Sequence, residues 1–166
     1  MAGNLRELQR LLNRAADQIP DQALRIIEVE GLNFIRKNFN DEGFNDNSLR
    51  KWQARKTTDK DGNDLTRYRS NRRGRQGDLT QFGQREIGRA ILTGHNTGGD
   101  KLRNSWRAKR NKSRKQVGFY TYKDYAEYHN TGSGNLPKRQ MIGKSVYLER
   151  KIYDKVKRTL DNHFRS

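Results

Sequence analysis

Residues 101–121, KLRNSWRAKRNKSRKQVGFYT, contain the pattern that decides the fold class. The chain alternates here with a period of two, which would place two sets of side chains on opposite faces of a strand: Leu102, Asn104, Trp106 and Ala108 on one, and Lys101, Arg103, Arg107 and Lys109 on the other. A turn near Asn111 leads into a second alternation through Val117 and Phe119. The stretch predicts an antiparallel hairpin with one buried face and one solvated, strongly basic face, and the buried face is the more probable place for Trp106.

Helical spacing lies on both sides of this hairpin in the sequence. Apolar residues follow three- and four-residue steps over residues 5–19, and a second such face runs over residues 23–38. Pro20 lies between them and predicts either two helices or one helix kinked near this residue. Apolar residues four apart over 148–160 predict a C-terminal helix, for which Ser145 is a suitable N-cap.

Shorter patterns complete the α+β assignment. We expect a short helix over residues 79–92, one helical turn over 125–129 and an extended stretch over 137–142. Together these patterns predict N-terminal helices and a long C-terminal helix packed on a small antiparallel sheet, with a long basic loop or arm. We expect a single domain over residues 1–166, divided into N-terminal helices (1–40), the basic loop or arm (41–80), a helix plus β-hairpin core (81–144) and the C-terminal helix (145–166).

The composition predicts a thin hydrophobic core. Hydrophobic residues make up 31% of the 166 residues, and 36 Lys and Arg against 19 Asp and Glu give a formal charge of +17. Such a chain is expected either to be ordered in part by partners or to carry a solvated arm. Residues 45–78, with ten Lys or Arg and few apolar residues, fit a flexible surface loop or an arm that orders against a neighbouring subunit.

The sequence predicts no enzyme, no cofactor and no metal site. Cysteine is absent, and His95, His129 and His163 have no neighbours at metal-ligand spacing. A phosphate cradle at residues 94–99, an acid–base pair of Glu127 with His129, and a ribonuclease-like toxin each lack the converging groups that their chemistry needs. No apolar run reaches the length of a membrane span, and charges interrupt the leucines of the N-terminal stretch, so we expect a cytoplasmic origin and no membrane partner.

The density of positive charge is greatest along the predicted hairpin. Residues 101–115 contain eight Lys or Arg and no acid. These residues form the candidate docking or DNA-facing surface: Lys101, Arg103, Arg107, Lys109, Arg110, Lys112, Arg114 and Lys115. They fit a solvated face, a track for a nucleic-acid backbone, or a surface complementary to an acidic protein.

Four stretches, in this order, resemble the bacteriophage virion-morphogenesis or tail-completion proteins of the type found in phages Mu and P2. The resemblance spans roughly residues 34–164, and its stretches are FNDEGF (39–44) with Trp52; IL (91–92), TGG (97–99) and LRNS (102–105); VGF (117–119), YAEYH (125–129) and Gly132; and LPKRQMIG (136–143). The chain departs from the family pattern in a longer basic segment at 45–78 and in two extra residues between Gly98 and Leu102.

The resemblance implies a non-enzymatic structural protein of the virion, which forms a homo-oligomeric ring at the head–tail junction or upper tail. Its partners would be identical copies, portal, adaptor or tail-tube proteins, and packaged DNA through non-specific contacts. The resemblance also implies a subunit-interface or fold motif, made of Trp52, Tyr125, Ala126, His129, Gly132, Pro137 and Arg139. The alternative, from charge alone, is a small basic nucleic-acid-binding protein without sequence specificity.

Overall fold

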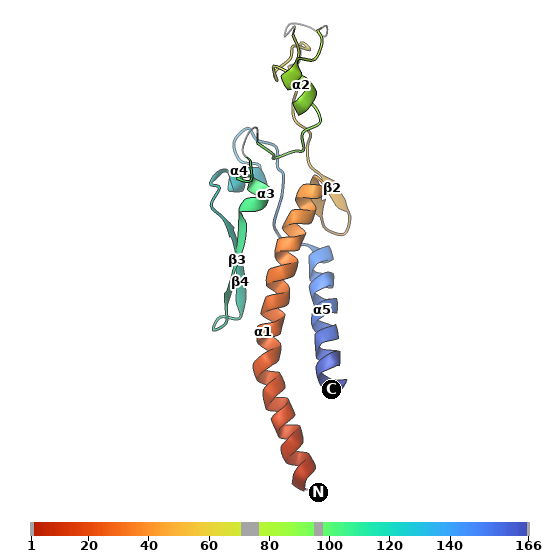
Figure 1. Cartoon of the computed structure of the whole chain (residues 1–166), viewed down its shortest axis with the longest axis vertical. Coiled ribbons are helices and arrows are strands. Elements are labelled where there is room, and N and C mark those ends of the chain that lie inside the picture. The colour runs from red at the N-terminus through yellow and green to blue at the C-terminus, as the bar shows by residue number, and fades with distance from the viewer. Residues whose placement is uncertain (1, 71–76, 95–97, 166) are drawn as a thin grey trace.

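A single long helix runs through the centre of the molecule in the computed structural model. The structure describes residues 2–70, 77–94 and 98–165, and within these ranges it describes side chains for residues 19–162. Helix α1 runs from Ala2 to Asn40 without a break at Pro20 (Figure 1). Of the two predicted alternatives, two separate helices are therefore wrong, and a single helix is present. Proline removes one helical hydrogen bond, and the next residue, Asp21, pairs with Lys112 of the hairpin at 3.0 Å.

Two elements lie along opposite sides of α1 (Figure 1). One is the antiparallel hairpin of β3 (Trp106–Asn111) and β4 (Gln116–Thr121), and the other is α5 (Val146–Arg165). Ser145 caps α5 as predicted, since its hydroxyl accepts from the Leu148 N–H at 3.1 Å. The α+β class, the hairpin and the long C-terminal helix are thus confirmed. Within the described residues, none of the helices has an apolar stretch of the length that a bilayer requires.

The strand predicted from Lys101 begins only at Trp106. Residues Leu102–Ser105 form a helical turn, α3, in which the Ser105 hydroxyl donates to the Leu102 carbonyl at 2.8 Å. The turn buries both Leu102 and Ser105, whereas a strand would have alternated buried and exposed residues across this stretch. Burial of Leu102 in the core therefore outweighed the strand that the alternation of these four residues predicted.

A second, unpredicted hairpin follows α1. Strands β1 (Gly43–Asn45) and β2 (Leu49–Lys51) pair antiparallel, with Phe44 opposite Arg50. Beyond them, the described part of residues 52–101 contains one short helix, α2 (Gln81–Glu86), and extends past the end of α1 (Figure 1). The helix predicted over 79–92 is confirmed only for these six residues, because Thr80 caps its start and the chain turns after Ile87, which is exposed.

The arm is the name used below for residues 52–101. Its turns are closed by local bonds: Asp59 accepts from the Asn63 N–H at 2.8 Å, and Asp64 accepts from the Thr66 N–H at 2.8 Å. The turn predicted at 61–63 is present, while most of the turn predicted at 74–77 lies outside the described residues. Local hydrogen bonds hold these turns, while Trp52 at the start of the arm and Ile91 and Leu92 near its end pack on the main core.

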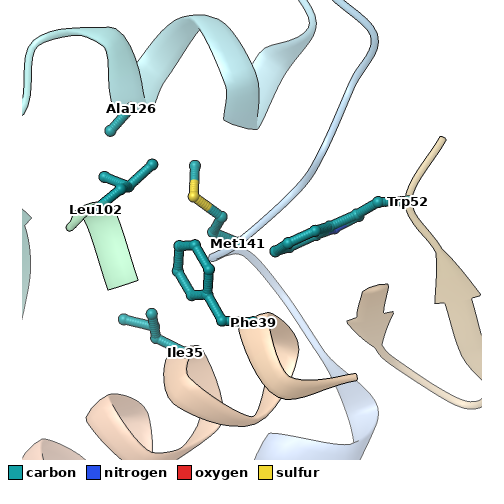
Figure 2. Close-up of a cluster of buried hydrophobic side chains, with 6 residues drawn as sticks. All are labelled: Ile35, Phe39, Trp52, Leu102, Ala126 and Met141. Atoms are coloured by element: carbon teal, nitrogen blue, oxygen red, sulfur yellow. The ribbon is translucent and has the colours of Figure 1, made fainter. Parts of the chain in front are cut away.

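The main core lies at the C-terminal end of α1, where side chains from four other segments pack against the helix (Figure 2). Its buried members are Ile35, Phe39, Trp52, Leu102, Ala126 and Met141. Phe39 and Trp52 meet edge to face with ring centroids 5.4 Å apart. The stretch predicted as extended over 137–142 is an irregular crossing segment that carries Met141 into this core.

Candidate functional site

The eight cations of residues 101–115 do not form one surface. Arg110 points toward α1, where its guanidinium pairs with Glu28 at 2.8 Å, and Lys112 pairs with Asp21 at 3.0 Å. These two residues therefore fasten the tip of the hairpin to α1. Their ion pairs with α1 set these two residues apart from the other six of the candidate docking surface, and Arg110 shares the inward face of β3 with Ala108.

The other six cations are distributed over three places. Lys101 and Arg103 lie at α3, where Arg103 donates to the Asn40 side chain at 3.0 Å. Arg107 and Lys109 face away from α1 on β3, and Arg114 and Lys115 lie in the hairpin turn. Among the residues that the structure describes, the last four have no ion-pair partner, and we call them the outer hairpin cations.

Three residues of the family-like motif lie inside the fold of one chain. Trp52 is buried and its indole N–H donates to the Gln140 carbonyl at 2.9 Å. Ala126 lies in the main core, and Arg139 is buried with its Nε donating to the Gln53 carbonyl at 3.1 Å. These contacts join the start of the arm to the crossing segment, which is a role in the fold.

The remaining motif residues surround helix α4 (Tyr125–Thr131). Gly132 ends this helix with φ +79°, and a Cβ there would lie 2.9 Å from the Lys138 backbone. Pro137 opens the crossing segment, and the His129 carbonyl accepts from the Arg139 N–H at 2.7 Å. Tyr125 is largely exposed and its ring meets that of His129 at right angles. The predicted helical turn at 125–129 is thus confirmed and extends two residues further.

An exposed row of tyrosines beside α4 was not predicted. Tyr120, Tyr122, Tyr125 and Tyr128 expose 53%, 58%, 45% and 55% of their surface. We call these four residues the tyrosine surface. The sequence contains a signal for this surface. Tyrosines two residues apart along a strand share one face, and tyrosines three residues apart along a helix lie on neighbouring positions of one face.

One of these residues, Tyr120, lines a hollow of about 400 Å³ between β4 and α4. Trp106, Phe119 and Ile142 form its apolar wall, and Asp124 and Glu127 line it as well. Trp106 is half-buried against the main core, yet its indole N–H is buried without a hydrogen-bond partner. Tyrosine and tryptophan with an unused polar atom are typical of surfaces that another protein covers.

The structure also places the residues that the sequence offered for metal binding or acid–base chemistry. The described residues include no group of three His, Asp or Glu side chains placed to hold a metal ion. Burial, and then the charge of Arg139, lower the pKa of His129, which keeps its imidazole neutral near pH 7. Glu127 is exposed, and no hydrogen bond joins it to His129 within the described part of the chain. His95 and the side chain of His163 lie outside the described residues.

Comparison of the chain with protein-family models, with curated proteins and with solved structures finds no match.

Proposed function

We propose that this chain is a non-enzymatic structural protein of a bacteriophage virion, which assembles into a homo-oligomeric ring at the head–tail junction or upper tail. The ordered resemblance of four sequence stretches to tail-completion proteins supports this proposal. In this role the ring joins the head to the tail, and its protein partners are a portal, adaptor or tail-tube ring.

Exposed apolar and aromatic side chains are the observation that carries the self-assembly part of the proposal. Leu65, Ile87, Tyr120 and Tyr128 expose 51%, 56%, 53% and 55% of their surface. Aromatic side chains in particular are enriched where proteins meet.

Two distinct surfaces of the chain suit the head-to-tail contact that a ring needs. The tyrosine surface, with its hollow and the acids Asp124 and Glu127, lies on one side of the molecule. The arm extends from the end of α1 and exposes Leu65 and Ile87 among basic residues (Figure 1). Opposite charge and shared apolar exposure make these two surfaces complementary between copies.

Light scattering after size exclusion, followed by negative-stain imaging, tests the proposal. We expect a mass that rises with concentration to a fixed multiple and closed rings in the images. Tyr120→Ser together with Tyr128→Ser should shift assembly to higher concentration, while Tyr153→Ser, an exposed tyrosine on α5, should leave it unchanged. A purified chain that remains monomeric at all concentrations, alone and with virion partners, would refute the ring.

A second candidate, non-specific nucleic-acid binding, is favoured by the outer hairpin cations and by Tyr120, which lies opposite Arg107 across the strands. Arg107→Glu with Lys109→Glu should then weaken DNA binding at low salt and reduce the salt slope. The matched control, Lys157→Glu with Arg158→Glu, makes the same change of charge on the exposed side of α5. Equal DNA affinity of both double variants would rule out the hairpin as a DNA track.

A further inference from the structure

A second hollow, of about 380 Å³, lies where the arm meets α4 and the crossing segment. Its apolar wall is formed by Ile91 and Leu92, and Tyr125 lies at its edge. Two arginines, Arg55 and Arg139, line the same hollow from different segments. The pocket therefore combines a small apolar wall with two guanidinium groups.

Both guanidinium groups lack a carboxylate at ion-pair distance within the described part of the chain. Arg139 bonds to the carbonyls of Gln53 and Ala54, and Arg55 bonds to those of Arg89 and Ala90. Each group has five N–H donors, so these bonds leave donors unused. Carbonyls orient the two cations but do not neutralise them.

Two acids, Glu42 and Glu86, act on Arg55 through their charge but form an ion pair with neither pocket arginine in the described residues. Glu42 accepts from the Ile91 N–H at 2.6 Å, and Glu86 pairs with Arg89 at 3.2 Å. Burial, and then the charge of Arg55, lower the pKa of Arg139, as expected for two cations that face each other without an anion between them. A buried charge is normally paired, so the pocket is electrostatically incomplete.

A third polar group points to the same conclusion. The Nδ1 atom of His129, which lines this pocket, is buried and has no hydrogen-bond partner. Two arginines with donors to spare and one histidine thus line one hollow.

We infer that this pocket binds a carboxylate carried on a short apolar stem, presented by a segment of a protein partner. The planar fork of a guanidinium matches a carboxylate through two parallel hydrogen bonds. The wall of Ile91 and Leu92 would cover the stem, which a bare phosphate does not have. The inference concerns a ligand site and does not depend on ring formation.

Ligand-observed NMR with the full-length chain tests this inference, whether the chain is a monomer or an assembly. The probes are N-acetyl-leucine, which imitates a C-terminus, N-acetylglutamate α-amide, which imitates an acidic side chain, and the neutral N-acetyl-leucinamide. We expect saturable binding of at least one carboxylate probe, about tenfold or more tighter than the neutral amide. Which carboxylate binds more tightly identifies the source.

Two variants and a control make the result specific. Arg55→Gln should weaken the carboxylate probe about tenfold, and Arg107→Gln on the outer hairpin should leave it unchanged. Thr93→Asp leaves both arginines in place and puts a carboxylate in the pocket wall, so it should also displace the probe even if Arg55→Gln fails to fold. Equal binding of the amide, binding of inorganic phosphate alone, or no saturable binding would overturn the inference.

Discussion

The packing of the hairpin on α1 predicts a substitution whose effect on stability changes sign between two sequence backgrounds. Gly31 lies on α1 directly under Phe119 of β4, and a Cβ at this position would lie 2.1 Å from the Phe119 Cζ atom. That is more than an ångström short of an ordinary contact, so Gly31→Ala forces the half-buried ring to move. Overpacking of this kind costs about 1–3 kcal/mol.

The same substitution has a separate benefit. Alanine in a helix interior is about 0.8–1.0 kcal/mol more favourable than glycine. We therefore expect Gly31→Ala to destabilise the natural chain by about 1 kcal/mol but to stabilise a Phe119→Ala chain by about 1 kcal/mol. The coupling between the two positions is then about 2 kcal/mol.

Urea unfolding followed by circular dichroism measures all four chains of this cycle. One low protein concentration should be used throughout, because association would add to the apparent stability. Gly88→Ala is the matched control, since a Cβ there meets nothing within 4 Å, and it should be neutral or slightly stabilising. An equal stabilisation by Gly31→Ala in both backgrounds would show that the hairpin does not rest on α1 at this point.

Three further predictions concern the links between elements. Burial raises the pKa of Glu30, but hydrogen bonds and charge from Lys155 and Lys151 outweigh it and lower the pKa below its ordinary 4.5. The stability that this carboxylate contributes is thus present above about pH 4.5 and is lost as the pH falls through the lower pKa of the folded state. Glu30→Gln should therefore flatten the acid side of the stability–pH curve measured by thermal unfolding. Gly132→Ala should cost about 1–2 kcal/mol from the left-handed backbone alone, lowering the melting temperature by several degrees. Arg110→Gln should cost about 0.5–1 kcal/mol at low salt and less at high salt, whereas Arg107→Gln should have no effect on unfolding.

Local patterns predicted the elements whose partners lie nearby in the sequence. The hairpin followed from alternation around the turn at 111–116, and α5 followed from its four-residue step and from Ser145. In both, the signal and the bonds that satisfy it lie within a few residues of each other. Their confirmation therefore needed no knowledge of the tertiary structure.

Elements fixed by distant contacts could not be predicted in this way. Arg110 looked like its exposed neighbours in the sequence, but its partner Glu28 belongs to a helix far away along the chain. The sequence around Pro20 predicted a break or kink in the helix, because the contact of Asp21 with the hairpin was unknown. The pocket of Arg55 and Arg139 likewise needed the fold, since separate segments bring the two cations together.

The distribution of charge limits how copies of this chain could meet. Part of the hairpin's positive charge is balanced by Asp21 and Glu28, so the surplus lies on the outer hairpin and in residues 45–78, which hold ten Lys or Arg against five Asp. Two copies of residues 45–78 side by side would repel each other. If the chain forms a ring, contact between these segments of neighbouring copies is therefore disfavoured, and each segment should instead meet an acidic surface such as that beside Asp124 and Glu127 or an acidic partner ring.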